Sequence, residues 1–343
     1  MIWPDDFSSH FFDAFYFKIR YKQLEIVIVE INLQAYAILY RVKRSYKSYM
    51  GIKITALIKK TFIFLTFIFI VIISSPLSAE EIKHGNEFNA LIQKLIHDGF
   101  EKQRIEQLFS NDNVFFNPRG VSLFFIHTES SLNYDQFLSK KSIANAFKYM
   151  DEHQDALNQA QKKYGVDRTV ITAILLVETR LGTYLGKRTV INTLSTMAAL
   201  TDVALQKRIW DSIPDNKKPK KEDFIKKVKQ RSKWGYEELK ALIKFSEQEK
   251  ISPEEIKGSY AGAMGISQFM PSNALRLARD GNKDGKIDLF IHADAIFSVA
   301  NYLTHHGWKS GIARQRQHEV LFTYNHSNYY VDTLLKISDK LKK

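Results

Sequence analysis

Cysteine is absent from the 343-residue chain, and its absence excludes several kinds of chemistry at once. Without a thiol the protein has no disulfide, no cysteine nucleophile and no cysteine-based zinc site. It also lacks the cysteine that a lipoprotein anchor needs directly after its signal segment. The chain shows no internal repeat and no coiled-coil heptad. The glycines around Lys187 miss the spacing of a phosphate-binding P-loop. No organic cofactor is expected.

The length suits two small domains or one large one, and the composition, 45% hydrophobic and 25% charged, is that of a globular protein. The formal net charge is +13. The first 79 residues hold ten lysines and arginines against five acidic residues, and the remainder holds 40 against 32. Such a basic protein suits acidic partners, which include nucleic acid, anionic lipid and an anionic cell-wall polymer.

Residues 50–79 have the layout of a secretory signal peptide. A basic stretch ends at Lys60, an apolar run covers residues 61–73, and small residues lead to Ala79. The run is short for a membrane span, which needs about 20 residues. Leu77 is an unusual residue two positions before a cleavage site, so an uncleaved membrane anchor is the alternative.

Residues 1–49 precede this segment and are interpreted as an over-extended start rather than a domain. Met50 stands where a signal peptide of this layout should begin. If the extension is translated, the signal is internal, and export no longer follows from the layout.

From residue 80 onward the apolar pattern predicts mainly helices. Helical spacing covers residues 88–96, and a longer helix is predicted over about 143–164, ended by Gly165. Asp167 is expected to cap the helix that follows it. Turns are predicted at 111–113 and 117–120, and the polar segment 211–233, with its lysine- and proline-rich run, is interpreted as a surface connection.

The stretch 170–182 is predicted to be an apolar helix with one carboxylate set into it. Glu178 follows the helical spacing of Ile171, Ile174 and Leu181, so it projects from the aliphatic face. Desolvation there favours the neutral acid, which is what a general acid requires near neutral pH. A buried glutamate paired with a distant arginine or lysine in a structural network is an equal alternative.

Residues 258–272 form a glycine-rich block that interleaves three glycines with small and amide side chains. Such a segment allows close backbone approach and directs side chains into a cleft. Gln268 can donate and accept hydrogen bonds, which suits sugar hydroxyls and N-acetyl groups. By spacing alone, close packing of a helix on a loop is the more common explanation of such a block.

The segment that starts at Asp280 matches the first nine positions of an EF-hand calcium loop. Oxygen ligands stand at positions 1, 3, 5 and 9, with glycine at 6 and an aliphatic residue at 8: Asp280, Asn282, Asp284, Asp288, Gly285 and Ile287. Position 12 should be glutamate but is Ile291, so Asp294 at position 15 would have to close a lengthened loop. Calcium is favoured because every candidate ligand is a hard oxygen. The alternative is an acidic turn without metal.

Aromatic and amide side chains gather again at 324–330. Such rings can line a sugar-binding groove by stacking on pyranose faces, whereas aromatic packing with an Asn or Ser helix cap is the alternative.

These blocks, in this order, resemble the lytic murein transglycosylase B family of lysozyme-like enzymes. The resemblance runs from about residue 85 to the C-terminus and rests on residues 177–182, 258–265, 268–272, 294–303, 306–308 and 324–327. It implies an α+β, predominantly α fold with a lysozyme-like catalytic core, an additional helical subdomain and a small EF-hand-like loop. Residues 80–165 would form the helical N-terminal part. Residues 166–343 would form the core, with an excursion at 202–257 and the metal loop at 280–294.

The resemblance also implies a reaction and a set of residues. Glu178 would cleave the β-1,4 bond between N-acetylmuramic acid and N-acetylglucosamine without water, acting first as acid and then as base and leaving 1,6-anhydromuramoyl ends. The sequence shows no second acid in a comparably apolar setting, and one carboxylate would suffice. Substrate contacts would be Ser259, Gln268, Tyr324, Asn325 and Tyr330. Calcium would be held by Asp280, Asn282, Asp284, the Lys286 carbonyl and Asp294.

The expected partners are peptidoglycan glycan strands and the complexes that make or degrade the wall, not nucleic acid, because no recognition motif for it is present. The expected location is the periplasm of a Gram-negative bacterium, with inner-membrane attachment only if the segment 50–79 stays uncleaved. A hydrolytic muramidase on the same fold and a non-catalytic wall-binding protein are the alternative functions.

Overall fold

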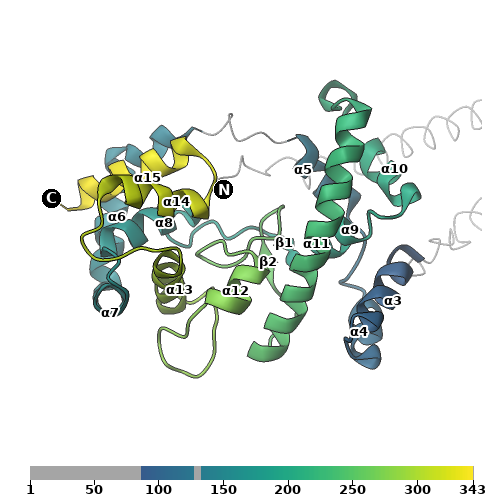
Figure 1. Cartoon of the computed structure of the whole chain (residues 1–343), viewed down its shortest axis with the longest axis horizontal. Helices are drawn as coiled ribbons and strands as arrows, with labels where there is room; N and C mark the ends of the chain where they lie inside the picture. Colours follow the sequence, from purple (N-terminus) through teal and green to yellow (C-terminus); the bar gives the residue numbers. More distant parts are fainter. Residues whose placement is uncertain (1–85, 127–132, 343) are drawn as a thin grey trace, which may run out of the picture. The chain divides into compact units, whose positions relative to one another are not determined.

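The computed structural model describes residues 86–126 and 133–342 (Figure 1). These residues belong to a unit that includes His84–Lys343. The predictions for residues 1–49 and 50–79 lie outside the described residues and remain predictions. Within the described ranges, no helix is both long and apolar enough to cross a membrane.

The described residues form helices joined mostly by short loops. In chain order the elements are η1 (Asn86–Phe88), α3 (Asn89–His97), α4 (Lys102–Phe109), α5 (Pro118–Ile126), η3 (Tyr134–Leu138), α6 (Lys140–Glu152), α7 (Gln154–Tyr164), α8 (Arg168–Thr179), β1 (Arg188–Thr189), α9 (Val190–Ala198), α10 (Val203–Asp211), η4 (Asp215–Lys217), α11 (Lys221–Glu249), β2 (Lys257–Gly258), α12 (Pro271–Leu277), α13 (His292–His305), α14 (Arg314–Tyr324) and α15 (Asn328–Leu341).

The sheet content of the described part is small, as the predicted fold class requires. β1 pairs with β2 in antiparallel register, with Arg188 opposite Gly258 and Thr189 opposite Lys257. This pairing joins the segment after α8 to the start of the glycine-rich block. The prediction of a predominantly α protein is confirmed.

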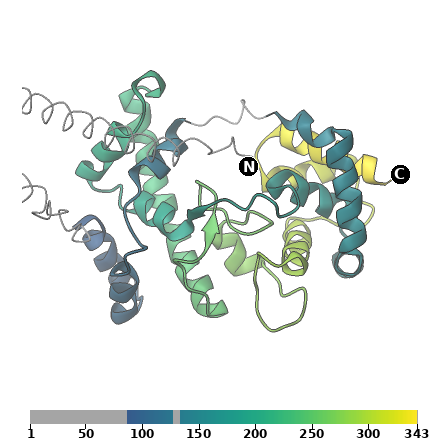
Figure 2. The ribbon, with the colours of Figure 1, turned by 180° about the vertical axis from the view of Figure 1, so that it is seen from behind.

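The helices pack in two groups that α12 connects (Figures 1 and 2). In the first group α8 packs against α6, α7, α13 and α15, and α14 packs on α15. In the second group α9 packs against α11 and α5, and α5 packs on α10. α12 contacts both α11 and α13, so the glycine-rich block that precedes it lies where the two groups meet.

The helix predicted over 143–164 is two helices, α6 and α7, separated at His153, whose backbone has left the helical conformation (φ −112°, ψ 25°). The break places the His153 ring against Tyr149 and His292, each at a centroid distance of 4.3 Å. Gly165 ends α7 in the left-handed conformation, as predicted. Asp167 stands at the start of α8, but its side chain accepts no backbone hydrogen bond there.

Two connections predicted from polar composition are helical instead. The 202–257 excursion contains α10 and the 29-residue α11, so the interpretation of 211–233 as a surface connection is wrong from Lys221 onward. α11 buries Phe224, Val228 and Leu239 against its neighbours while its other faces stay charged. The turn predicted at 117–120 is the first turn of α5, because proline is well tolerated at the start of a helix.

Candidate active site

Glu178 lies one residue before the end of α8, a helix buried along almost its whole length. Its side chain is only 5% exposed, as the helical spacing predicts. The Tyr330 hydroxyl, on α15, donates a hydrogen bond of 2.6 Å to Glu178 Oε1, and Tyr330 is itself fully buried. This bond connects residues 152 positions apart and fixes the direction in which the carboxyl group points.

The chain reverses sharply after Glu178. Arg180, Leu181 and Gly182 all have left-handed backbone angles (φ 48°, 62° and 88°). The Leu181 amide closes the end of α8 on the Leu175 carbonyl at 2.9 Å. A Cβ at Gly182 would meet the His292 ring at 3.0 Å, so the position favours glycine by both its backbone angle and its space.

Thr179 ties this turn to the glycine-rich block. Its hydroxyl donates to the Ile266 carbonyl at 2.9 Å and accepts from the Gly182 amide at 3.0 Å. The residue directly after Glu178 is therefore bonded to the segment that the sequence predicts to face the substrate. A shift of that segment would act on the end of α8 through one short contact.

The glycine-rich block folds into a tight loop. Met264 and Phe269 exchange backbone hydrogen bonds of 2.9 and 3.1 Å. Gly265 has φ 73°, and a Cβ there would lie 2.4 Å from the Leu289 Cβ and 2.6 Å from the Leu289 carbonyl oxygen. Ser259 is 1% exposed, and its hydroxyl oxygen accepts from two backbone amides of the loop. The close packing that the glycines allow is therefore present.

Gln268 lies at the turn of this loop with φ 50°, an unusual angle for a side-chain-bearing residue. Its Nε2 donates to the Gly265 carbonyl at 2.9 Å, but its buried Oε1 has no donor within the described part of the chain. The Ser267 hydroxyl is likewise buried without a partner there. Unpaired buried polar atoms are uncommon and often accompany a functional site.

The junction of α14 and α15 brings the predicted aromatic residues to the same place. The Tyr324 hydroxyl donates to the Ser267 carbonyl at 2.5 Å. Burial, reinforced by the nearby Glu178 carboxylate, raises the pKa of Tyr324 and of Tyr330 well above the usual value, so both remain phenols. Asn325 is half-buried at the end of α14.

Tyr330 differs from its predicted position. The sequence suggests an aromatic residue on the groove surface, whereas the structure buries Tyr330 completely and uses its hydroxyl to hold Glu178. The alternative of aromatic packing with a helix cap holds here, because the Ser327 hydroxyl oxygen accepts from the Tyr330 amide at the start of α15. Of the two neighbouring tyrosines Tyr329 and Tyr330, the exposed one is Tyr329, whose relative accessibility is 79%. Helical spacing after Ser327 could have distinguished the two tyrosines.

The segment 280–288 curls around its own carboxylates. Asp280 accepts from the Lys283 and Gly285 amides, at 2.5 and 2.9 Å. Asp294, fully buried at the start of α13, reaches into the loop and accepts from the Gly281 amide at 2.9 Å and the Asp288 amide at 2.8 Å. Burial raises the pKa of Asp294, and the Asp280 carboxylate adds to this effect.

The donor set of this loop suits a hard cation in part. Its side chains offer oxygen, and within the described part no lysine or arginine lies within 4.0 Å of Asp280, Asp284 or Asp294 as an ion pair. A side-chain hydrogen bond and, to a smaller extent, the nearby Lys286 charge lower the pKa of Asp284. Ile291 at the twelfth position offers none. Within residues 86–126 and 133–342, no three His, Asp or Glu side chains converge as a metal cage.

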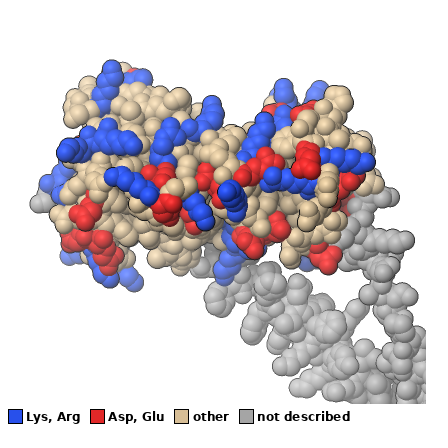
Figure 3. All heavy atoms as spheres, turned by 90° about the horizontal axis from the view of Figure 1, so that it is seen from below, with Lys and Arg blue, Asp and Glu red and all other residues tan. Residues whose placement is uncertain are grey.

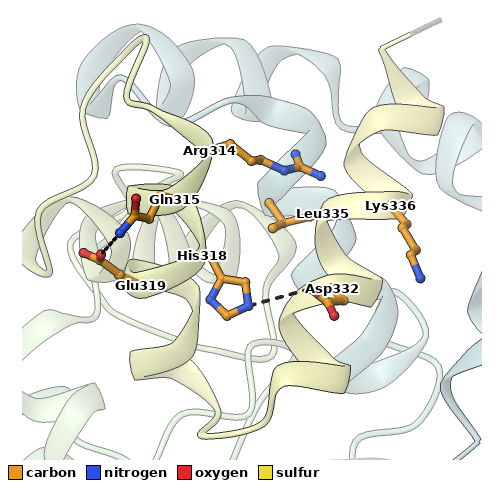
Figure 4. Close-up of a pocket in the computed structure, with 7 residues that line it drawn as sticks. All are labelled: Arg314, Gln315, His318, Glu319, Asp332, Leu335 and Lys336. Atoms are coloured by element: carbon orange, nitrogen blue, oxygen red, sulfur yellow. Dashed lines mark hydrogen bonds and ion pairs between the residues drawn. The ribbon is translucent and has the colours of Figure 1, made fainter.

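Two hollows of similar volume are not lined by Glu178. One of about 520 Å³ opens between α14 and α15, where His318 and Asp332 approach to 3.7 Å (Figure 4). Another of about 500 Å³ borders the end of α8 at Leu176 and Arg180. The hydrogen bonds around the carboxyl group, rather than the size of a hollow, therefore identify the candidate site.

Charges of both signs are interspersed over the face drawn in Figure 3.

Comparison of the sequence with known protein families gives a clear match. A family model described as "Transglycosylase SLT domain" matches residues 83–317. The chain belongs to this family. Membrane-bound lytic murein transglycosylase B of Escherichia coli K12 is 32% identical over 176 residues, which cover 51% of this chain and 41% of that protein. The match therefore spans less than half the length of that relative.

Solved structures share the fold. The E. coli lytic transglycosylase Slt35 in complex with calcium aligns with a TM-score of 0.61 at 22% identity, covering 76% of this chain and 94% of that one. SltB1 of Pseudomonas aeruginosa, a soluble lytic transglycosylase, aligns with a TM-score of 0.60 at 22% identity, covering 73% and 96%. The lysozyme-like, predominantly helical core predicted from the sequence agrees with this fold.

Proposed function

We propose that the protein is a peptidoglycan lytic transglycosylase that cleaves the bond between N-acetylmuramic acid and N-acetylglucosamine without consuming water. Membership of the transglycosylase family supports the reaction class. The observation that carries the assignment to a residue is Glu178, a buried carboxyl group aimed by the Tyr330 hydroxyl and set beside the glycine-rich loop.

In this proposal Glu178 performs both proton transfers. It protonates the glycosidic oxygen as the bond to C1 breaks, and the resulting carboxylate then takes the proton of the C6 hydroxyl of the muramoyl residue. That hydroxyl forms the new bond to C1, which yields the 1,6-anhydro end and returns Glu178 to its starting state. One residue that alternates as acid and base replaces the paired carboxylates of most glycosidases.

The other buried acids have structural partners. The structure buries three further acids, because Glu238, Glu249 and Asp294 are each less than 10% exposed, but each lies among polar hydrogen-bond donors. Glu238 accepts from the backbone and the side chain of Ser272, and Glu249 accepts from the Ile287 amide. Backbone amides donate hydrogen bonds to all three carboxyl groups. These acids therefore stabilise helix ends and loops and are not assigned a catalytic role.

The substrate contacts remain part of the proposal. Gln268 has a buried Oε1 that lacks a donor in the described residues, which a hydroxyl or acetamido N–H of the sugar would supply. Ser259, Tyr324 and Asn325 would border the same sugar. Tyr330 would act through Glu178 as a positioning residue.

The reaction is tested by digesting purified peptidoglycan and identifying the products by mass spectrometry. We expect 1,6-anhydromuramoyl ends from the wild type and their loss in Glu178→Gln. Glu238→Gln is the matched control, since it neutralises another buried glutamate whose partners lie at the start of α12. Reducing ends without anhydro ends would identify a hydrolytic muramidase. Muropeptide release at the wild-type level by Glu178→Gln would remove Glu178 from the mechanism.

We also propose that the loop binds Ca²⁺ through Asp280, Asn282, Asp284, the Lys286 carbonyl and Asp294. The similar Slt35 structure is in complex with calcium. The carboxylates of this loop accept hydrogen bonds from the backbone, and a bound cation would add a counter-ion to them. A chelator should lower the melting temperature, because a ligand bound only by the folded protein stabilises it. Asp280→Asn should lose this response, and an unchanged melting curve with excess chelator would contradict the site.

We further propose that residues 50–79 direct export of the protein to the periplasm of a Gram-negative bacterium. The relative from E. coli is named as membrane-bound. N-terminal sequencing of the protein from the envelope fraction tests the start at Met50 and cleavage after Ala79 together. A mature chain that begins before residue 50 would contradict both.

A further inference from the structure

A cluster of aromatic and basic side chains adjoins the glycine-rich loop. Phe124 of α5 lies between Trp234 of α11 and Tyr260 of the loop, with ring centroids 6.0 and 5.9 Å away. The Arg231 guanidinium lies over Phe124 at 4.5 Å and over Trp234 at 5.4 Å, and the Lys227 ammonium lies 5.9 Å from the centre of the Phe124 ring. We call these five residues the Phe124 cluster.

Both cations of the cluster lack an anionic partner. Within residues 86–126 and 133–342, neither the Arg231 guanidinium nor the Lys227 ammonium forms a hydrogen bond or an ion pair. Each is half-buried, and burial lowers the pKa of each. Aromatic rings attract such cations but do not replace the hydrogen bonds that burial removes. An external carboxylate would restore those bonds, and the planar guanidinium can accept it in a two-pronged contact.

The cluster is continuous with the proposed cleavage site. Tyr260 directly follows Ser259, whose hydroxyl organises the glycine-rich loop, and that loop is bonded through Ile266 to the residue after Glu178. Tyr260 therefore places the cluster directly beside the glycine-rich loop. Phe124 and Trp234 hold the basic groups there.

We propose that Arg231 and Lys227 bind free carboxylates of the stem peptide carried by the peptidoglycan strand, with Phe124 and Trp234 holding the two cations in place. The inference rests on the proposed function and adds a preference for glycan that still bears acidic peptides. Peptide carboxylates are the ligand because the site offers two unpaired cations and no unpaired acid of its own. The cluster takes part in binding and in no step of bond cleavage.

The test compares two substrates: peptidoglycan with its stem peptides, and the same strands after an amidase has removed them. For the double variant Arg231→Gln/Lys227→Gln we expect KM on the peptide-bearing strands to rise about tenfold, with kcat unchanged, which corresponds to about 1.4 kcal/mol of binding. On the peptide-free strands the variant should match the wild type. Lys226→Gln/Lys229→Gln is the control, because it removes equal charge from exposed positions of the same helix.

Two results would overturn the inference. An equal loss on both substrates would show that the cluster supports the fold or the glycan site rather than the peptide. An equal effect of the control pair would show long-range attraction instead of direct contact. Failure of the proposed function is separate, because it would appear as an absence of anhydro ends from either substrate with the wild type. A binding titration with soluble stem peptide and its carboxyl-amidated form, on the Glu178→Gln protein, measures the contact without turnover.

Discussion

Tyr330→Phe removes a single oxygen from the centre of the site. The ring is fully buried, and within the described residues its hydroxyl donates only to Glu178. Phenylalanine at this position therefore keeps the packing and deletes the 2.6 Å hydrogen bond. A hydrogen bond to a carboxylate contributes about 1.5–3 kcal/mol when its acceptor is buried. If that energy fixes the orientation of Glu178, its loss should reduce kcat by roughly 10- to 100-fold, because each 1.36 kcal/mol is a tenfold change in rate.

The assay is the initial rate of anhydro-muropeptide release, with the melting temperature measured in parallel. Tyr236→Phe is the matched control, because it deletes another bond between a buried phenol and a carboxylate, 3.0 Å from Tyr236 to Asp98, between α11 and the loop after α3. We expect this control to keep its turnover. If Tyr330→Phe also keeps wild-type turnover while its folding is intact, the positioning role assigned to Tyr330 is refuted.

Three further changes test the surroundings. Thr179→Val should destabilise the fold by about 1–3 kcal/mol and lower turnover, because the Ile266 carbonyl loses its 2.9 Å donor; chemical unfolding and the release assay measure both. Gly265→Ala should cost at least about 1–3 kcal/mol in the same unfolding experiment, since φ is 73° and the added methyl meets Leu289. For Glu238, burial raises the pKa above its usual value, so the folded state favours the neutral acid and its contribution to stability is lost as pH rises through the folded-state pKa. The melting temperature of the wild type relative to Glu238→Gln should therefore fall with rising pH, and a constant difference would contradict this.

The sequence predicts the orientation of α8 well because its apolar spacing is regular. Glu178 is buried as that spacing requires. The spacing cannot identify Tyr330 as its partner, because that contact depends on how α15 packs against α8. Aromatic residues near the end of the chain indicated a site, but only packing shows that Tyr330 lies beneath the carboxyl group.

α11 shows where sequence patterns fail. Its buried face includes Ser232, Gly235 and Glu238 among the apolar residues, and a lysine-rich run precedes it. These residues weaken the helical periodicity, and the segment resembles a solvated connection. No proline or glycine marks the break at His153. It is stabilised by ring contacts with His292, which lies 139 positions later in the chain, so local sequence does not reveal it.

The position of Glu178 at the end of its helix explains why a loop can control it. A carboxyl group in the middle of α8 would be fixed by the helix alone. One residue later the chain enters three consecutive left-handed residues, and Thr179 bonds that turn to Ile266 of the glycine-rich loop. The same loop continues through Ser267, bonded to Tyr324, and begins next to Tyr260 in the Phe124 cluster. On the proposed mechanism, a substrate that seats on the loop would act on the same short network that orients the acid, so that binding along the strand would be coupled to the geometry of proton transfer.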